Sequence, residues 1–326
     1  MNASSGKVIA LAGGVGGAKL ADGLAQVLRE KLTVVVNTGD DFEHLGLRIS
    51  PDLDTVMYTL AGLANPIQGW GLQGESWAFM EQVARLGGPE WFRLGDRDLA
   101  THAIRTSRLN GGATLTAVTA ELCRSLGIVA RILPMSDEPV RTVIRSGDDL
   151  FSFQDYFVRL RCEVPVSEIS YEGSTSARLN RELVGIGAAD RPAAVIFCPS
   201  NPYLSIDPIL AIPGVRDWLR ALQVPVVAVS PIVGGTAIKG PAAKIMLELG
   251  GPVSVTTIAE HYRGLISGIV IDEIDAQLQD QIEATGAAVR VAPTIMRSTA
   301  DRVSLAETCL AFADDLGRRL LSRSGN

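Results

Sequence analysis

The sequence is poor in the residues that build thiolate, disulfide and histidine-based sites. It contains 4 cysteines and 3 histidines in 326 residues, and no two cysteines form a CxxC pair. Cysteines spaced this widely indicate free thiols in a reducing compartment rather than a disulfide framework or a zinc site. No Ser-His-Asp or Cys-His arrangement can be defended with so few histidines, which argues against nucleophilic catalysis by a triad.

Long runs of one charge and long apolar runs are also missing. The formal net charge is −6, from 30 basic and 36 acidic residues without a long basic block, which argues against nucleic acid as a partner. No apolar stretch approaches membrane-spanning length, and the first residues lack a signal-peptide pattern. We therefore expect a soluble cytoplasmic protein without a membrane partner.

The apolar residues that are present predict a parallel α/β sheet. With 47% hydrophobic residues the chain can bury a large core. A strand over 7–12, a glycine-rich turn over 13–17, a helix from Ala18 to about Arg29 and a strand over 32–36 form a βαβ opening with a right-handed crossover. Further strands are expected at 193–197, 224–229 and 268–271. Residues 135–190 alternate short strand-like runs with charges and turns, and we interpret them as an insertion or cap.

The glycine-rich turn lies where a strand meets a helix. Backbone amides and the positive end of a helix can hold a phosphate at such a turn. The dinucleotide fingerprint is excluded because Lys19 stands where a third glycine is required, and no Gly-Lys-Ser/Thr closes a Walker A loop. The alternative is a tight turn that needs positive φ. The candidate phosphate-binding residues are Gly13, Gly14, Val15, Gly16 and Gly17.

Four aspartates follow the second strand within fifteen residues: Asp40, Asp41, Asp52 and Asp54. Ligands of open α/β sheets bind beyond the carboxyl ends of the strands. Carboxylates are costly to pack there unless a cation neutralises them, and hard oxygen ligands suit Mg²⁺ with substrate phosphates. Alternatively, these aspartates form turns, and Asp52 or Asp54 caps the helix that follows.

Three polar residues follow the later strands: Ser200, Asn201 and Ser230. They can hydrogen-bond a base or a phosphate, or else satisfy the backbone of their own turns. A further turn follows Ser230 and leads to Lys239, which can meet a phosphate or be solvated.

The stretch from Arg93 to Arg105 mixes charges of both signs around a glycine. Its arginines, Arg93, Arg97 and Arg105, can bind a diphosphate bidentately. The alternative is an exposed helix start with Asp96 or Asp98 as the cap. Of the histidines, His102 is predicted to be structural, His44 is the better placed for a base, and His261 lies on an ordinary helical stretch.

Taken together, these motifs resemble the 2-phospho-L-lactate transferase family of coenzyme F-420 biosynthesis. They occur in family order from about residue 7 to 310. They are Gly-Gly-Val-Gly-Gly-Ala-Lys-Leu at 13–20, Val-Asn-Thr-Gly-Asp-Asp at 36–41, Ser-Pro-Asp-Leu-Asp-Thr at 50–55, Leu-Gly-Asp-Arg-Asp-Leu-Ala-Thr-His at 94–102, Pro-Met-Ser-Asp at 134–137, Phe-Gln-Asp-Tyr-Phe at 153–157, Pro-Ser-Asn-Pro at 199–202 and Ser-Pro-Ile at 230–232.

The resemblance implies a Rossmann-like three-layer parallel sheet core with a smaller inserted α+β region, in a homodimer. Residues 1–134 would form a nucleotide- and metal-binding half with a helical segment, 135–190 the insertion and 191–326 the second half of the core. It also implies Mg²⁺-dependent transfer from a guanosine diphosphate ester of a three-carbon acid to the ribityl hydroxyl of Fo, a deazaflavin precursor, with release of GMP. The acid, phospholactate, phosphoenolpyruvate or phosphoglycerate, is left open.

Carried over by position, the metal and acceptor gather at Asp40, Asp52 and Asp54. Asp54 and Arg93 match positions that bind the deazaflavin, and the guanosine diphosphate falls at residues 13–17, Ser200, Asn201 and Ser230. Our hypothesis assigns the metal to Asp40 and gives Asp54 the task of orienting or deprotonating the ribityl hydroxyl. Asp52 could exchange roles with either.

Two alternatives follow from parts of the same pattern. A non-catalytic nucleotide-sugar-binding regulator on the related fold shares the glycine turn and the Asp-Asp strand end. It normally continues with a Gly-Gly-Ser-Ser-Gly-like loop, whereas this chain continues with Phe-Glu-His-Leu-Gly at 42–46. A nicotinamide dehydrogenase is disfavoured by Lys19.

Overall fold

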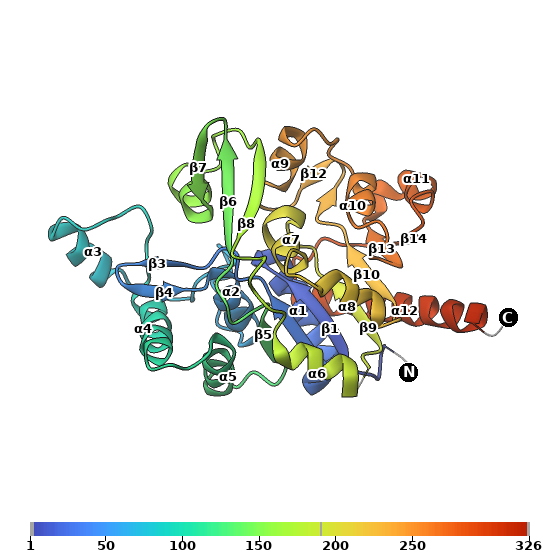
Figure 1. The fold of residues 1–326 in the computed structure, drawn as a ribbon, viewed down its shortest axis with the longest axis horizontal. Helices are drawn as coiled ribbons and strands as arrows, with labels where there is room; N and C mark the ends of the chain where they lie inside the picture. The colour runs from blue at the N-terminus through green and yellow to red at the C-terminus, as the bar shows by residue number, and fades with distance from the viewer. Residues whose placement is uncertain (1–2, 190, 325–326) are drawn as a thin grey trace.

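The computed structural model describes residues 3–189 and 191–324, and its centre is a seven-stranded parallel sheet (Figure 1). The strand order is β14-β13-β10-β9-β1-β2-β5, so β1 is an interior strand, between β2 and β9. The strands are β1 (Val8–Ala12), β2 (Leu32–Val36), β5 (Arg131–Pro134), β9 (Ala194–Phe197), β10 (Val226–Val229), β13 (Gly268–Ile271) and β14 (Ala288–Val291).

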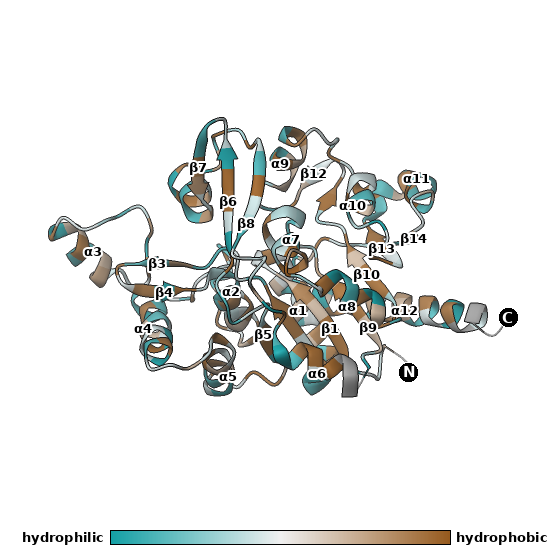
Figure 2. Cartoon of the chain, viewed as in Figure 1, coloured by the Kyte–Doolittle hydropathy of each residue, from teal (hydrophilic) through white to brown (hydrophobic). Residues whose placement is uncertain are grey.

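Both faces of this sheet are covered, which explains the continuous apolar runs of its strands. Every residue of β1, β2, β9, β10 and β13 is buried, and Figure 2 shows the central strands as hydrophobic ribbons. Alternate residues serve different cores: Ala10 and Ala12 belong to one, Ile9 and Leu11 to the other. The predicted α/β parallel architecture, with helices on both faces of the sheet, is therefore confirmed.

The helices divide between the two cores. The core of Ala10 and Ala12 is covered by α1 (Gly14–Leu28), α2 (Pro51–Leu60), α5 (Leu115–Ser125) and α12 (Thr299–Ser324). The other core is covered by α6 (Arg181–Ala189), α7 (Asp207–Leu210), α8 (Val215–Ala221), α9 (Ala242–Glu248), α10 (Val255–His261) and α11 (Gln279–Glu283). Among the described residues, no helix is long and apolar enough to cross a lipid bilayer.

Two smaller units extend from the sheet. A lobe after β2 holds the hairpin β3 (Phe42–His44) and β4 (Leu47–Ile49) with α3 (Ala78–Arg85) and α4 (Asp96–Asn110), around a small core of Ile49, Met80 and Leu94. The other is a three-stranded antiparallel sheet in the order β7-β6-β8, formed by β6 (Arg141–Ser146), β7 (Asp149–Ser152) and β8 (Glu168–Glu172). In Figure 1 the lobe extends to the left of the central sheet and the three-stranded sheet to the top. A short hairpin, β11 (Ile232–Val233) and β12 (Thr236–Ala237), follows β10.

The three-stranded sheet lies within the segment that the sequence marks as an insertion. Ile144, Tyr156 and Val166 of this segment form a separate hydrophobic cluster with Leu204 and Ile245, which come from outside the insertion. The same segment also contains α6, which packs on the main core through Leu183. The boundaries at 135 and 190 stay a prediction, and residue 190 lies outside the described residues.

The predicted start of the first helix is wrong by one turn. Helix α1 begins at Gly14 rather than at Ala18, so Val15, Gly16 and Gly17 belong to its first turn instead of a preceding loop. Gly14 has φ +61°, a conformation that favours glycine. The carboxylate of Asp52 accepts the Gly14 N–H at 2.6 Å, and this satisfied donor allows the helix to start early.

Candidate functional site

The carboxyl ends of β1, β2, β9 and β10 place four polar turns along one edge of the sheet. At the centre, the N–H of Gly13 after β1 donates to Ser200 Oγ after β9, at 3.1 Å. Gly16 and Gly17 pack against Pro199 and Ser200, and a Cβ at either glycine would collide with them. These glycines therefore allow two loops to approach one another, a reason that the sequence alone does not reveal.

Asn37 joins two of the predicted aspartates. It is fully buried at the end of β2, and its Nδ2 donates to Asp52 Oδ2 at 2.9 Å and lies 3.3 Å from Asp40 Oδ1. Leu204 O is a third acceptor at 3.2 Å, while an amide nitrogen has only two hydrogens. Because Asn37 cannot satisfy all three acceptors, the Asp40–Asp52 pair is short of a positive partner.

The pKa shifts of Asp40 and Asp52 agree with this shortage of partners. Burial raises the pKa of Asp40 well above its usual range, and repulsion from Asp52 and Asp41 raises it further. Burial likewise raises the pKa of Asp52 to about 6, against hydrogen bonds from Asn37 and Gly14. Among the described residues no cationic side chain is ion-paired with either carboxylate. Two buried, unneutralised carboxylates offer the hard oxygen ligands that fit Mg²⁺.

The fourth aspartate, Asp54, has a different environment. Its two oxygens contact both terminal nitrogens of Arg105, with Nη1 at 3.1 Å from Oδ2. Arg105 is only 1% exposed, and His102 lies between Asp54 and Asp98, with its ring nitrogens 3.6 and 3.5 Å from their oxygens. Burial raises the pKa of Asp54, while Arg105 and His102 oppose this shift. The carboxylate of Asp54 is therefore already neutralised inside the protein.

The spacing of Asp54, Asp98 and His102 would also permit a metal ion, because their ligand atoms lie within 4.8 Å of one another. Two observations oppose a cation there. Arg105 already occupies both oxygens of Asp54, and Asp98 accepts a hydrogen bond from Tyr58 OH at 2.5 Å. Asp40 and Asp52 are therefore the better metal candidates, and a ligand role for Asp54 stays a prediction.

The arginines predicted as a diphosphate set do not act together. Arg105 is buried with Asp54, Arg93 is exposed and stacks over the Trp77 ring at 4.3 Å, and Arg97 donates to Gln73 O at 3.1 Å. This interpretation of the three arginines is wrong for Arg105, because its charge is used internally. A contact between Arg93 and a deazaflavin stays a prediction.

The predicted caps are also rearranged. Asp96 accepts the N–H groups of Ala78 and Phe79, so it caps α3 rather than its own helix. Glu75 in turn accepts the N–H groups of Arg97 and Asp98 at the start of α4. Asp52 caps α1 through Gly14 rather than α2.

The remaining polar turn residues mainly serve their own turns. Ser230 Oγ accepts from the N–H of Ile232 and donates to its carbonyl, and Asn201 Oδ1 accepts the N–H of Tyr203 at 3.0 Å. The Nδ2 of Asn201 is buried without a partner among the described residues. His44, considered as a base, lies instead among Phe42, Trp91 and Phe92, where burial lowers its pKa. Nucleotide binding by Ser200, Asn201 and Ser230 stays a prediction.

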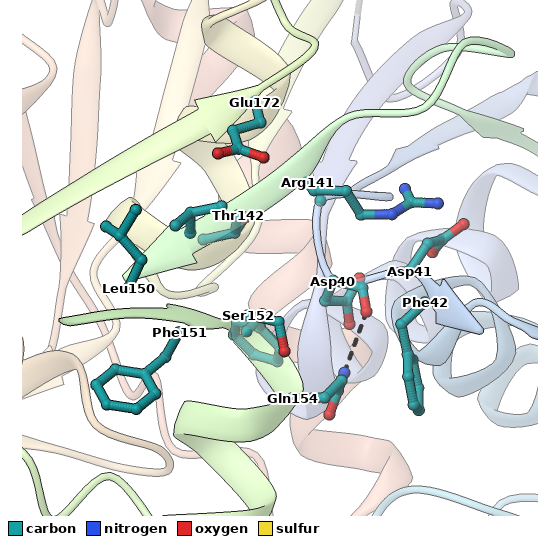
Figure 3. A pocket seen from close by; sticks show the side chains of 13 residues that line it. Asp40, Asp41, Phe42, Arg141, Thr142, Leu150, Phe151, Ser152, Gln154 and Glu172 are labelled. Atoms are coloured by element: carbon teal, nitrogen blue, oxygen red, sulfur yellow. Dashed lines mark hydrogen bonds between the residues drawn. The ribbon is translucent and has the colours of Figure 1, made fainter. Parts of the chain in front are cut away.

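Several residues at the site come from the insertion and were missed by sequence reasoning. The Thr142 N–H donates to Gly39 O at 2.7 Å, and Gln154 Nε2 donates to Asp40 O at 3.1 Å (Figure 3). Both hold the loop that carries Asp40. Gln154 belongs to the Phe-Gln-Asp-Tyr-Phe motif, which was a usable signal, whereas no pattern marked Thr142.

Two neighbouring cavities open beside this loop. One, of about 320 Å³, is lined by Asp40, Asp41, Arg141 and Gln154 among others, and Figure 3 shows these side chains. The second, of about 230 Å³, shares Asp41 and Arg141 with the first and continues towards Ser50. Open space therefore lies beside Asp40 and Asp41, whereas neither of these two cavities is lined by Asp52 or by the loops after β1 and β9. An acidic residue beside such a space suits an anionic ligand held through a cation.

Comparison with known proteins gives the same family as the sequence motifs. The family model described as "2-phospho-L-lactate transferase CofD" matches residues 8–308. A phosphoenolpyruvate transferase of Streptomyces griseus is 41% identical over 318 residues, covering 95% of this chain and 99% of the relative. A 2-phospho-L-lactate transferase of Methanosarcina mazei is 39% identical over 301 residues, covering 92% and 98%.

Among solved structures, a UPF0052-family protein from Bacillus halodurans superposes with a TM-score of 0.61, covering 94% of this chain and 99% of that one. At 14% identity this likeness concerns the fold alone. The family model and the two relatives reach across nearly the whole chain, and the protein therefore belongs to the 2-phospho-L-lactate transferase CofD family.

Proposed function

We propose that the protein transfers a phospho-three-carbon-acid group from its guanosine diphosphate ester to the ribityl hydroxyl of Fo and releases GMP, as a Mg²⁺-dependent step of coenzyme F-420 biosynthesis. The family is one of transferases, and relatives of similar identity carry the names phosphoenolpyruvate transferase and 2-phospho-L-lactate transferase. The acid transferred is therefore one of this class.

The observation that carries the proposal is the buried Asp40–Asp52 pair, which lacks a cationic partner among the described residues. Phosphoryl transfer depends mostly on positioning and on neutralising oxygen charge. Bound Mg²⁺ would be held by Asp40 and Asp52 and would neutralise the phosphate oxygens. Asn37 would hold the two carboxylates in their relative positions. The loops after β1 and β9 would contact the nucleotide.

The acceptor hydroxyl also needs to be oriented. Asp54 lies with Asp52 in the first turn of α2, close in the chain to the proposed metal site. Its ion pair with Arg105 keeps the carboxylate charged and fixed, which would suit accepting a hydrogen bond from the ribityl hydroxyl. Both oxygens of Asp54 already contact Arg105, so we favour orientation over deprotonation as its role.

The test is to incubate the purified protein with Fo, Mg²⁺ and, in separate reactions, the guanylylated forms of phospholactate, phosphoenolpyruvate and phosphoglycerate. Mass spectrometry of the deazaflavin products should show one adduct forming in preference to the others, with a matching amount of GMP. Omission of Mg²⁺ should abolish it. Binding of the guanylylated acid without any deazaflavin adduct would contradict the proposal and would favour a non-catalytic binding protein.

A further inference from the structure

Arg141, at the start of β6, has no role in the proposed function as described so far. It lines both cavities beside the acidic loop, and it is the cationic residue lining the larger one. The other cation of the smaller cavity, Arg48, is ion-paired with Glu43 at 3.5 Å. Arg141 therefore supplies the available positive charge to both spaces.

The guanidinium of Arg141 has few hydrogen bonds, although its positive charge also opposes the raised pKa values of Asp41 and Asp40. One terminal nitrogen donates to Val140 O at 2.8 Å, and no other hydrogen bond or ion pair of its side chain is found within the described parts of the chain. Its ladder neighbour on β8 is Glu172, and Figure 3 shows the two side chains pointing apart. Because a guanidinium has five N–H donors, four remain for a ligand.

Other polar atoms around the same spaces also lack partners. Thr38 Oγ1, Asp41 Oδ1 and Thr142 Oγ1 are buried without a hydrogen-bond partner among the described residues, and their side chains are at most 8% exposed. Thr38 lines the smaller cavity, Thr142 the larger and Asp41 both. Buried polar atoms without partners are costly, so the two hydroxyls of Thr38 and Thr142 beside Arg141 indicate a polar ligand.

We infer that Arg141, assisted by the hydroxyls of Thr38 and Thr142, binds the carboxylate of the three-carbon acid in the donor. This inference rests on the proposed function. Arginine binds carboxylates through paired N–H groups, and a hydroxyl can donate to the same anion. Arg141 is thus a specificity-determining residue for an acid-bearing donor.

The order of the strands supports the carboxylate over the diphosphate as the ligand. The loops proposed for the nucleotide follow β1, β9 and β10. Strand β6 instead follows β5 in the chain, and β5 is the edge strand next to β2, at the other end of the strand order from β10. The acidic loop with Asp40 lies between them. A donor extended across this row would place its guanosine near β9 and its acid near Arg141.

The experiment compares two donors on two proteins. One donor is the guanosine diphosphate ester of the three-carbon acid, and the other carries a methyl group in place of the carboxylate. Arg141→Gln should lower kcat/KM for the acid donor by about 10- to 100-fold, the loss expected for a hydrogen bond to a charged group. The value for the methyl donor should stay the same. An equal loss with both donors would overturn the inference, because the guanidinium would then serve the diphosphate or the acidic loop.

Arg145→Gln is the matched control. Arg145 lies on the same strand, is paired with Glu168 at 2.9 Å and lines neither cavity, so both donors should react as with the wild type. Thr142→Val should reduce the preference for the acid donor about five-fold, since it removes one neutral donor. If Arg141→Gln does not fold, Arg141→Lys provides the comparison, with a smaller loss confined to the acid donor.

Calorimetric titration of each donor without Fo separates this inference from the proposed function. A wild type that forms no adduct, yet binds the acid donor more tightly than the methyl donor through Arg141, would refute transfer and retain the anion site. A wild type that transfers the acid group while Arg141→Gln keeps its full preference would refute the anion site alone.

Discussion

Asp54 and the Asp40–Asp52 pair belong to the same site, but the protein balances the charge of Asp54 and not that of the pair. Asp54 is paired with Arg105 and flanked by His102, so its charge is balanced inside the protein. Asp40 and Asp52 share only the amide of Asn37. The comparison teaches that position in the sequence does not separate a carboxylate whose charge is balanced inside the protein from one that is left for a bound cation. The presence of an internal cation does.

The largest effect should come from removing a charge from the unneutralised pair. Asp40→Asn should lower kcat about 10²- to 10³-fold, the scale of losing one preorganised electrostatic contact. It should leave the metal-free protein at least as stable at pH 8, because a buried charge disappears. Product formation and thermal unfolding in EDTA measure the two effects. Asp149→Asn, at the exposed start of β7, is the control, and an active Asp40→Asn enzyme would remove the metal assignment.

The next effect concerns the neutralised group. Arg105→Gln would leave Asp54 buried without its cation, and we expect the free energy of unfolding to fall by about 3–5 kcal/mol. Urea denaturation measures it. Asp54→Asn combined with Arg105→Gln should recover part of the loss. Arg108, on the same helix as Arg105, forms an exposed ion pair with Glu121 of α5, so Arg108→Gln should cost less than about 1 kcal/mol. A single variant as stable as the wild type would contradict the internal pairing.

A smaller effect should appear in the pH dependence of the metal-free protein. The folded-state pKa is about 7 for Asp41 and about 6 for Asp52, both raised by burial above the usual 3.8. Between pH 4 and 7 the folded state therefore binds more protons than the unfolded state, and stability falls as the pH rises. The unfolding temperature in EDTA should decrease over this range, and saturating Mg²⁺ should reduce the decrease. A flat profile without metal would contradict the raised pKa values of Asp41 and Asp52.

The smallest effect should come from the insertion. Gln154→Met removes the hydrogen bond to the Asp40 carbonyl, at a cost of about 1 kcal/mol, which corresponds to a several-fold higher Mg²⁺ concentration at half-maximal rate. The maximal rate at saturating Mg²⁺ should change little. Titration of the rate with Mg²⁺ measures this, and an unchanged midpoint would show that the loop keeps its position without Gln154.

The sequence predicted those features that depend on local patterns. Buried strands, the opening βαβ unit and the run of aspartates after β2 all follow from periodicity and from residue types near one another in the chain. The partners of these residues were not predictable in the same way. Asp54 meets Arg105 across 51 positions, Asp52 caps a helix that begins 38 residues earlier, and Gln154 reaches Asp40 across 114. Such contacts are decided by tertiary packing, which leaves little trace in a single sequence.

The contact of Gly16 and Gly17 with the loop after β9 determines how far apart these two loops lie. One added carbon at either position would have to push the two loops apart, because the backbone of Pro199 and the hydroxyl of Ser200 already fill that space. The polar atoms that face each other across the gap would move with their loops. The spacing between these two loops thus leaves no room for even one methyl group.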